Sequence, residues 1–237
     1  MNTFEFDSIA RGMVVVAHAD DAEWGYSGTV AKLVSYGVEM TYIICTDGSK
    51  GSDDPEMTSE QLTAIRMEEQ KNACRVLGVR NLIFLGYSDS LLEPSLALRK
   101  DIVRQIRTFK PDLMICQSPL RNLTDSDYIG HPDHIAAGEA TLSAVFPTSR
   151  DRLTFPELAG EGLTPHKVTE LLVGDRNYAN KWVDVTAHMD VAVKALLQHV
   201  SQISNKDVGK HLKDSRANIG ESVKVKYAES YRSYVFS

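Results

Sequence analysis

The sequence lacks the features that membrane-spanning and nucleic-acid-binding proteins need. Its longest apolar runs, such as Met13–Ala17 and Leu113–Cys116, are far shorter than the roughly 20 residues that cross a bilayer. It has no block of Lys and Arg, and among 237 residues 32 acidic side chains outnumber 26 basic ones, for a net charge of −6. Such a chain lacks the cationic surface that releases counterions from nucleic acid. We therefore expect neither membrane insertion nor nucleic-acid binding.

Cysteine is also scarce. Cys45, Cys74 and Cys116 are odd in number, and none of them belongs to a CxxC pair. The N-terminal segment carries Glu5 and Asp7 where a signal peptide would be basic, and no apolar stretch follows them. We therefore expect reduced, buried cysteines in a cytoplasmic protein.

What the sequence does contain is an alternation of short apolar runs and amphipathic stretches, with 43% hydrophobic and 24% charged residues overall. The runs that predict strands are Met13–Ala17, Met40–Cys45, Asn81–Leu85, Leu113–Gln117 and Lys181–Thr186. The stretches that predict helices are Tyr26–Tyr36, Glu60–Leu77, Ser95–Thr108, Asp133–Val145 and His188–Ile203. This order predicts an α/β, Rossmann-like fold of three layers around a mostly parallel sheet, in a single domain over residues 1–237. Between Pro147 and Asn180 the pattern weakens, and the charged run Lys206–Arg216 is expected to be a solvated loop.

Two clusters of polar residues stand at the ends of predicted strands. Ala17–Glu23 directly follows the first strand, and Gly130–His134 directly precedes a helix. In an open parallel sheet, ligands bind in the crevice outside the carboxyl ends of the strands. We therefore expect the two clusters to meet in space although more than 100 residues separate them.

His18, Asp21 and His134 together supply two imidazoles and a carboxylate. That set suits a catalytic zinc ion, which keeps a fourth position for water and lowers the pKa of that water to about 7; iron, cobalt or manganese also fit it. Asp20 is adjacent to a ligand yet spared from coordination, so it is the expected general base. His131 lies one helical turn before His134, where it faces the substrate oxygen or the leaving nitrogen.

Each cluster alone has a structural explanation. Two acidic residues after a strand often cap a helix, and an HxxH pattern at a helix start is often two surface histidines. The presence of both clusters in one chain, each at a strand-to-helix junction, favours a metal site. His199, by contrast, falls among apolar residues of a predicted helix and is expected to be structural.

The two clusters also resemble the signatures of a known family. His18–Glu23 (HADDAE) is similar to the HPDDxE segment of the PIG-L/LmbE-like zinc-dependent N-deacetylases, and His131–His134 matches their HPDH segment. Further similar elements occur in the family's order over roughly residues 12–204: Thr46–Gly48 (TDG), Arg66–Glu69 (RxxE), Gly86–Asp89 (GYSD), Val183–Thr186 (VDVT) and His199–Gln202 (HVSQ).

The resemblance implies an LmbE-like fold and hydrolysis of an N-acyl group, usually N-acetyl, from an amino sugar or sugar conjugate. It implies that His18, Asp21 and His134 hold one zinc ion, that Asp20 is the general base, and that His131 stabilises the oxyanion or protonates the amine. Arg66, Asp47 and Asp89 are expected to contact the substrate. The partner is then a small N-acylated sugar, and the sequence leaves homo-oligomer formation open.

Two positions depart from the family pattern. Ala19 replaces the family's proline, which frees the backbone at that turn but removes no ligand. Ile129 stands two residues before His131, where some members have a tyrosine, and Tyr128 lies one residue earlier. A tyrosine contribution to the oxyanion is therefore not predicted.

Three alternatives remain at this point. An amidase of thiol conjugates, also found in the family, would use an identical site. A nucleotide-binding Rossmann protein is disfavoured because the first strand-to-helix turn lacks GxGxxG and its acidic residues would repel a pyrophosphate. A metal-binding module without catalysis would not need Asp20 and His131.

Overall fold

A seven-stranded sheet forms the centre of the computed structural model, which describes residues 8–121, 123, 129–203 and 207–236. The strands are β1 (Arg11–Val16), β2 (Glu39–Thr46), β3 (Asn81–Tyr87), β4 (Leu113–Gln117), β5 (Glu170–Gly174), β6 (Lys181–Asp184) and β7 (Ala228–Val235). Their order across the sheet is β3-β2-β1-β4-β5-β7-β6. The neighbouring strands from β3 to β5 are parallel, and β7 runs antiparallel to both β5 and β6.

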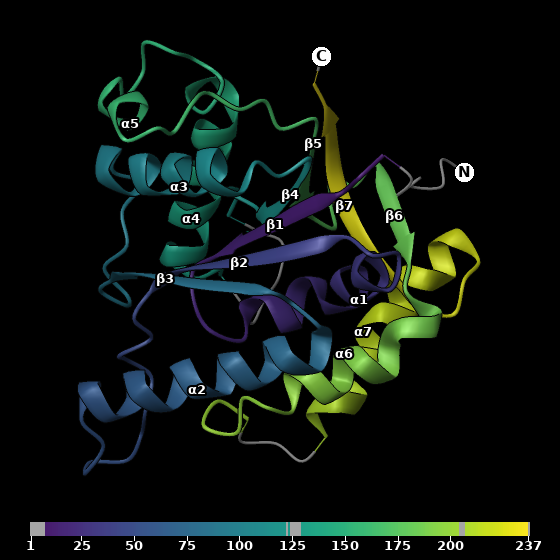
Figure 1. The fold of residues 1–237 in the computed structure, drawn as a ribbon. Helices are drawn as coiled ribbons and strands as arrows, with labels where there is room; N and C mark the ends of the chain where they lie inside the picture. The colour runs from purple at the N-terminus through teal and green to yellow at the C-terminus, as the bar shows by residue number, and fades with distance from the viewer. Residues whose placement is uncertain (1–7, 122, 124–128, 204–206, 237) are drawn as a thin grey trace.

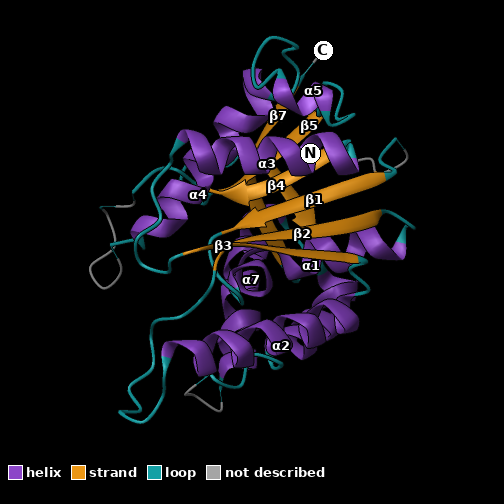
Figure 2. Cartoon of the chain, turned by 60° about the vertical axis from the view of Figure 1, so that its left-hand side comes forward, coloured by secondary structure: helices purple, strands orange, loops and turns teal. Residues whose placement is uncertain are grey.

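Helices cover both faces of this sheet (Figures 1 and 2). They are α1 (Asp21–Ser35), α2 (Ser59–Leu77), α3 (Leu96–Phe109), α4 (Pro132–Ser143), α5 (Glu157–Gly160), α6 (Met189–Leu196) and α7 (Val208–Val223). Helices α1, α2, α6 and α7 pack on one face, whereas α3, α4 and α5 pack on the other. The predicted three-layer α/β architecture with a mostly parallel sheet is therefore confirmed. Among the helices that the structure describes, none is both long and apolar enough to cross a membrane.

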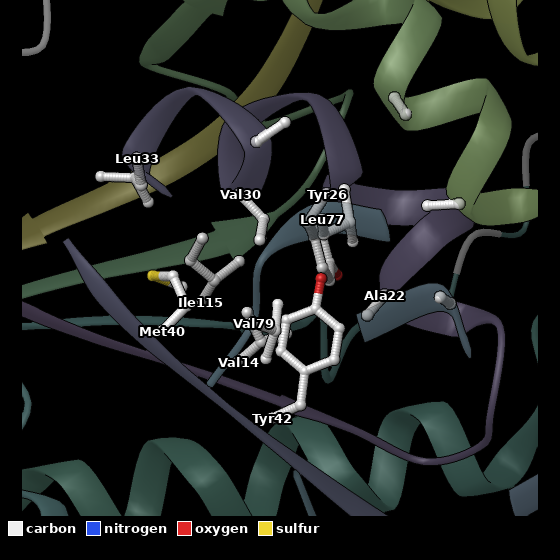
Figure 3. Packing of buried hydrophobic residues seen from close by; sticks show 14 of the residues in the cluster. Val14, Ala22, Tyr26, Val30, Leu33, Met40, Tyr42, Leu77, Val79 and Ile115 are labelled. Atoms are coloured by element: carbon white, nitrogen blue, oxygen red, sulfur yellow. The ribbon is translucent and has the colours of Figure 1, made fainter. Parts of the chain in front are cut away.

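The two cores follow from the alternation of side chains along the central strand. Val14 and Val16 of β1 point into the core beneath α1, while Met13 and Val15 point into the core beneath α3 and α4. Figure 3 shows the first core, where Val14 and the ring of Tyr42 lie among side chains from α1 and α2. Every residue of β1 after Arg11 is buried because helices cover both faces of the strand.

The fold places one crevice at the centre of the carboxyl edge. Chain order reverses between β1 and β4, since β2 and β3 lie on one side of β1 and β4 and β5 lie on the other. The connections that leave β1 and β4 therefore separate, and this is the position at which doubly wound folds bind ligands. Both polar clusters flank this point.

The structure corrects several element boundaries. Helix α1 begins at Asp21, five residues before the predicted start. The prediction missed this first turn because its acidic residues hide any apolar periodicity. The helix predicted to reach Ile203 ends at Leu196, because His199 and Ser201 instead bond to side chains of α1 and α2.

The C-terminal part of the chain differs most from expectation. Strand β5, helix α7 and strand β7 had no predicted counterpart, and the charged run beginning at Lys206, which itself lies outside the described residues, is not a loop. From Val208 it is part of α7, where Arg216 is buried and its Nε donates to Glu229 at 3.3 Å. Because most residues of α7 are polar, the apolar contacts by which it packs could not be recognised in the sequence. Cys45, Cys74 and Cys116 are free and buried, as predicted.

Candidate active site

The two polar clusters meet at the crevice, as the sequence predicts. His18 follows β1, Asp21 begins α1, and His134 lies in the first turn of α4. Nδ1 of His18 lies 3.3 Å from Nε2 of His134 and 3.3 Å from Oδ2 of Asp21. Nε2 of His134 lies 3.0 Å from Oδ1 of Asp21. Two segments more than 100 residues apart thus bring two imidazole nitrogens and a carboxylate together, and Asp21 approaches His18 through Oδ2 and His134 through Oδ1.

These separations fit a metal ion. Ligand bonds of about 2.0–2.1 Å in a tetrahedral zinc site place the ligand atoms roughly 3.3 Å apart. His18, His131 and His134 also form a group whose ligand atoms all lie within 4.8 Å of one another. A second such group, His18 with Asp89 and Asp133, lies around the same ring. The donor set is therefore suited to one divalent cation, and the side of the His18 ring that it occupies depends on the role of each nitrogen.

Two carboxylates face the other ring nitrogen of His18. Its Nε2 donates to Oδ2 of Asp133 at 3.1 Å and lies 3.2 Å from Oδ1 of Asp89. Asp133 is fully buried and also accepts the backbone N–H of Ser90 at 2.7 Å. A carboxylate that accepts the second ring N–H is the usual way in which proteins orient a metal-binding histidine. Asp133 was not singled out by the sequence, although it lies within the HPDH segment.

The site has an excess of negative charge. Burial disfavours a charged His18, but hydrogen bonds to Asp133, Asp21 and Asp89 outweigh it and raise the pKa of His18 to about 12. Burial likewise favours a neutral Asp21, yet the neighbouring His134 and His18 hold the pKa of Asp21 well below its usual range. A site that holds a proton this firmly is electrostatically prepared for a cation.

Asp20 differs from its neighbour in both conformation and ionisation. Its backbone has φ 85°, the left-handed conformation that residues other than glycine rarely adopt. Burial, and then the charge of Asp21, raise the pKa of Asp20 to about 7. The side chain lies 3.9 Å from Nη2 of Arg66. Asp20 thus faces the crevice without joining the three ligand atoms, as expected of a general base.

His131 caps α4 and faces the same crevice. Its Nδ1 accepts the backbone N–H of Asp133 at 3.2 Å, so in the neutral ring the proton resides on Nε2. Burial, followed by the charge of His18, lowers the pKa of His131. The ring packs edge-on against His18 with centroids 4.7 Å apart. At neutral pH His131 is therefore an uncharged donor through Nε2.

Of the three residues expected to contact substrate, Arg66 and Asp89 line a pocket at the site, and all three also hold loops in place. Arg66 is buried; its Nη2 donates to the carbonyl of Ala19 at 3.0 Å, and its Nη1 lies 3.6 Å from Oδ2 of Asp89. Asp47 accepts the backbone N–H groups of Ser49 and Asp89 through Oδ1, so it shapes the loop that carries Asp89. Substrate contact by these three residues stays a prediction.

Two pockets adjoin the candidate metal-ligand group. One, of about 250 Å³, is lined by His18, Asp20, Asp21, Lys50, Gly51, Arg66, Asp89, Ser90, His131, His134 and Gln202. The other, of about 470 Å³, shares Asp21, His131 and His134 with it and extends to Trp24, Leu120 and Arg176. A ligand with two unequal parts can therefore extend from the candidate metal position into both pockets. Ile129 is exposed, and Tyr128 lies outside the described residues.

Comparison with known proteins agrees with this geometry. The sequence profile of the PIG-L family, described as GlcNAc-PI de-N-acetylase, matches residues 13–145, which is more than half of the chain and includes both clusters. The chain belongs to the PIG-L family. The predicted resemblance is thereby confirmed.

Relatives within this family share most of the chain. Diacetylchitobiose deacetylase of Thermococcus kodakarensis is 31% identical over 83% of this chain and 72% of its own length. A probable N-acetyl-alpha-D-glucosaminyl L-malate deacetylase 2 of Bacillus anthracis is 31% identical over 82% of both chains. Mycothiol S-conjugate amidase of Streptomyces coelicolor is 31% identical over 67% of this chain and 59% of its own length.

Similarity to solved structures covers more of the chain than the residues that the family profile matches. N,N'-diacetylchitobiose deacetylase of Pyrococcus horikoshii superposes with a TM-score of 0.88 at 29% identity and covers 97% of this chain and 85% of that one. The LmbE-like fold is therefore confirmed. A hydratase of Pseudomonas putida shares the fold with a TM-score of 0.76 at only 17% identity. Because one fold can host different reactions, the site residues must carry the functional argument.

Proposed function

We propose that this protein is a metal-dependent N-deacetylase of amino-sugar conjugates. The observation that carries the proposal is the mutual proximity of His18 Nδ1, His134 Nε2 and the Asp21 carboxylate, with separations of 3.0–3.3 Å between the nitrogens and from each nitrogen to one Asp21 oxygen. Membership of the PIG-L family and the names of its relatives support the reaction class. We propose these three residues as the ligands of a single zinc ion, because two imidazoles and one carboxylate leave a position open.

The cation would supply Lewis-acid polarisation of the amide carbonyl and acidification of water. The protein's own groups provide the remaining chemistry. Asp20, whose pKa of about 7 keeps it able to accept a proton near neutral pH, removes the proton of the attacking water and later passes it to the leaving amine. His131 donates its Nε2–H to the oxygen of the tetrahedral intermediate, where negative charge develops. Asp133 holds the His18 ring through Nε2.

The relatives favour N-acetylglucosamine linked to a second group as the substrate. Two of the relatives above are named as deacetylases of diacetylchitobiose and of an N-acetylglucosaminyl malate, and a further relative, from Actinosynnema mirum, is named as a deacetylase of an inositol glycoside. Two pockets that both adjoin the candidate metal ligands provide room for such an extended substrate. An amidase of a thiol conjugate would use the same site, and one relative has that activity.

The deciding experiment is an assay of acetate release by zinc-reconstituted enzyme. The panel contains N-acetylglucosamine, diacetylchitobiose, and the malate and inositol conjugates of N-acetylglucosamine, with enzyme stripped of metal by a chelator as the control. We expect acetate release from at least one conjugate, abolished by stripping and restored by zinc. A fully metal-loaded enzyme that releases no acetate but cleaves a mycothiol conjugate would replace the deacetylase proposal with the amidase one.

A further inference from the structure

The peptide unit that joins Ala19 to the left-handed Asp20 is held through both its N–H and its carbonyl. Its N–H donates to Oε1 of Gln70 at 3.1 Å. The preceding carbonyl, that of Ala19, accepts Nη2 of Arg66 at 3.0 Å. Both partners lie on α2, one helical turn apart. A strained conformation persists only where the surroundings fix it, and α2 supplies that constraint.

Gln70 can make this contact in only one orientation of its amide. The side chain is fully buried, and its Nε2 lies 3.2 Å from both carboxylate oxygens of Glu23. An ionised carboxylate only accepts hydrogen bonds, and a backbone N–H only donates. The NH2 group of Gln70 must therefore face Glu23, which leaves its oxygen facing Asp20.

Glu23 is fixed in turn by His199. Both side chains are fully buried, and Nε2 of His199 donates to Oε2 of Glu23 at 3.1 Å. The segment that carries His199 is fastened to α2 as well, since Glu69 accepts both the backbone N–H and the hydroxyl of Ser201 at 2.7 Å. This chain of contacts brings together the HADDAE, RxxE and HVSQ segments.

We infer that Gln70 is a positioning residue for Asp20, and that Glu23 and His199 act by fixing the orientation of the Gln70 amide. The inference rests on the proposed function, in which the Asp20 carboxylate is the base. Without the bond from Gln70, the Asp20 backbone relaxes out of the left-handed region and its carboxylate turns away from the crevice. Since none of these three residues provides a ligand atom, metal binding and substrate affinity are retained while kcat falls.

A reciprocal exchange tests the inference. Q70E sets two carboxylates against each other, and E23Q presents one amide oxygen to two donors while its own NH2 faces a donor. In Q70E/E23Q every donor again faces an acceptor. The carboxylate now at position 70 would accept from the Asp20 N–H and from the amide now at position 23, whose oxygen would accept from His199.

We expect each single variant to lose kcat by about 10- to 100-fold with unchanged KM and zinc content. The double variant should recover to within roughly threefold of wild type, a strong non-additivity.

Crystal structures of the same variants give a readout that needs no substrate. We expect Asp20 to leave positive φ in the single variants and to regain it in the double variant. The matched control is E229Q. Glu229 is as buried as Glu23 and accepts the N–H groups of Gly28 and Thr29 in the same helix, but it does not contact Asp20 or Gln70. E229Q should lower Tm without changing kcat.

Three outcomes would overturn the inference. In the first, the single variants lower Tm but leave kcat unchanged, as expected of E229Q. In the second, Asp20 keeps its positive φ in the single variants. In the third, the double variant fails to fold or does not recover kcat. A wild-type enzyme that releases no acetate from any substrate would instead overturn the proposed function, while the conformation of Asp20 in the variants would still decide the inference.

Discussion

Oδ2 of Asp133 lies 3.1 Å from Nε2 of His18, on the side of the ring opposite the nitrogen that faces Asp21 and His134. This contact keeps a proton on Nε2, so the proton that a metal ion would displace is the one on Nδ1, the nitrogen that faces the other two proposed ligands. Because the carboxylate also raises the basicity of the ring, Asp133 is expected to contribute to metal affinity without touching the ion.

Replacing Asp133 with Asn should weaken zinc binding by roughly 10- to 100-fold, the usual effect of losing a carboxylate behind a ligating histidine. Titration against a chromophoric chelator would measure the change. D112N is the control, since Asp112 accepts N–H groups of Ala10 and Arg11 at the far end of β1. Unchanged zinc affinity in D133N would exclude this role for Asp133.

The position of the ion can be decided by comparing ligand variants. His18→Ala, Asp21→Ala and His134→Ala should each lose bound metal, because each removes one of three ligands. Asp89→Ala should keep it, since Asp89 faces Nε2 of His18. Elemental analysis of the purified variants measures the metal content. If Asp89→Ala lost the metal while His134→Ala kept it, the ion would lie in the group of His18, Asp89 and Asp133 instead.

Asp20→Asn should retain zinc and the fold but lose kcat by about 10²- to 10⁴-fold, the usual effect of removing a general base. Steady-state kinetics at measured zinc stoichiometry would test this. The loss of metal from D20N would mean that Asp20 is a ligand, and a near-normal kcat would mean that another group accepts the proton.

The ionisation of Asp20 also predicts a pH dependence of stability in metal-free protein. The folded protein, with a pKa of about 7 for Asp20, keeps a proton that the unfolded chain releases near its usual value of 3.8. The stabilisation from this group is therefore fully present below the unfolded pKa, decreases as pH rises from the unfolded to the folded pKa, and is lost above the folded pKa. Relative to D20N, the Tm of the wild type should fall between about pH 4 and pH 7 and stay level above that range. A constant or rising difference would contradict the raised pKa.

His131→Ala should keep zinc and lose kcat/KM by about 10²- to 10³-fold, as when one oxyanion donor is removed. Because the pKa of His131 is lowered, the wild-type rate should not fall as pH rises through the ordinary range of histidine. Kinetics of both enzymes from acidic to alkaline pH would measure this. Wild-type rates in His131→Ala would reduce His131 to a helix cap.

The sequence by itself determined the fold class and the edge of the sheet at which the two polar clusters meet. Periodicity along β1 and the helix after it is local, and polar residues directly after a strand lie at its carboxyl end in any parallel sheet. The meeting of His18, Asp21 and His134 in one crevice was therefore predictable, and their role as metal ligands stays a prediction. The boundaries and the C-terminal elements were less predictable, because α7 is polar and packs through contacts such as that between Arg216 and Glu229.

Only the tertiary structure decided how each site residue is held. The choice between the two nitrogens of His18 depends on Asp133, 115 residues away. The left-handed backbone of Asp20 depends on Gln70, and the orientation of Gln70 depends on Glu23 and His199, a pair separated by 176 residues. A buried glutamine or histidine has the same sequence signature whether it fills a core or orients a base. The difference lies in which donor faces which acceptor, and that is fixed only when distant segments pack together.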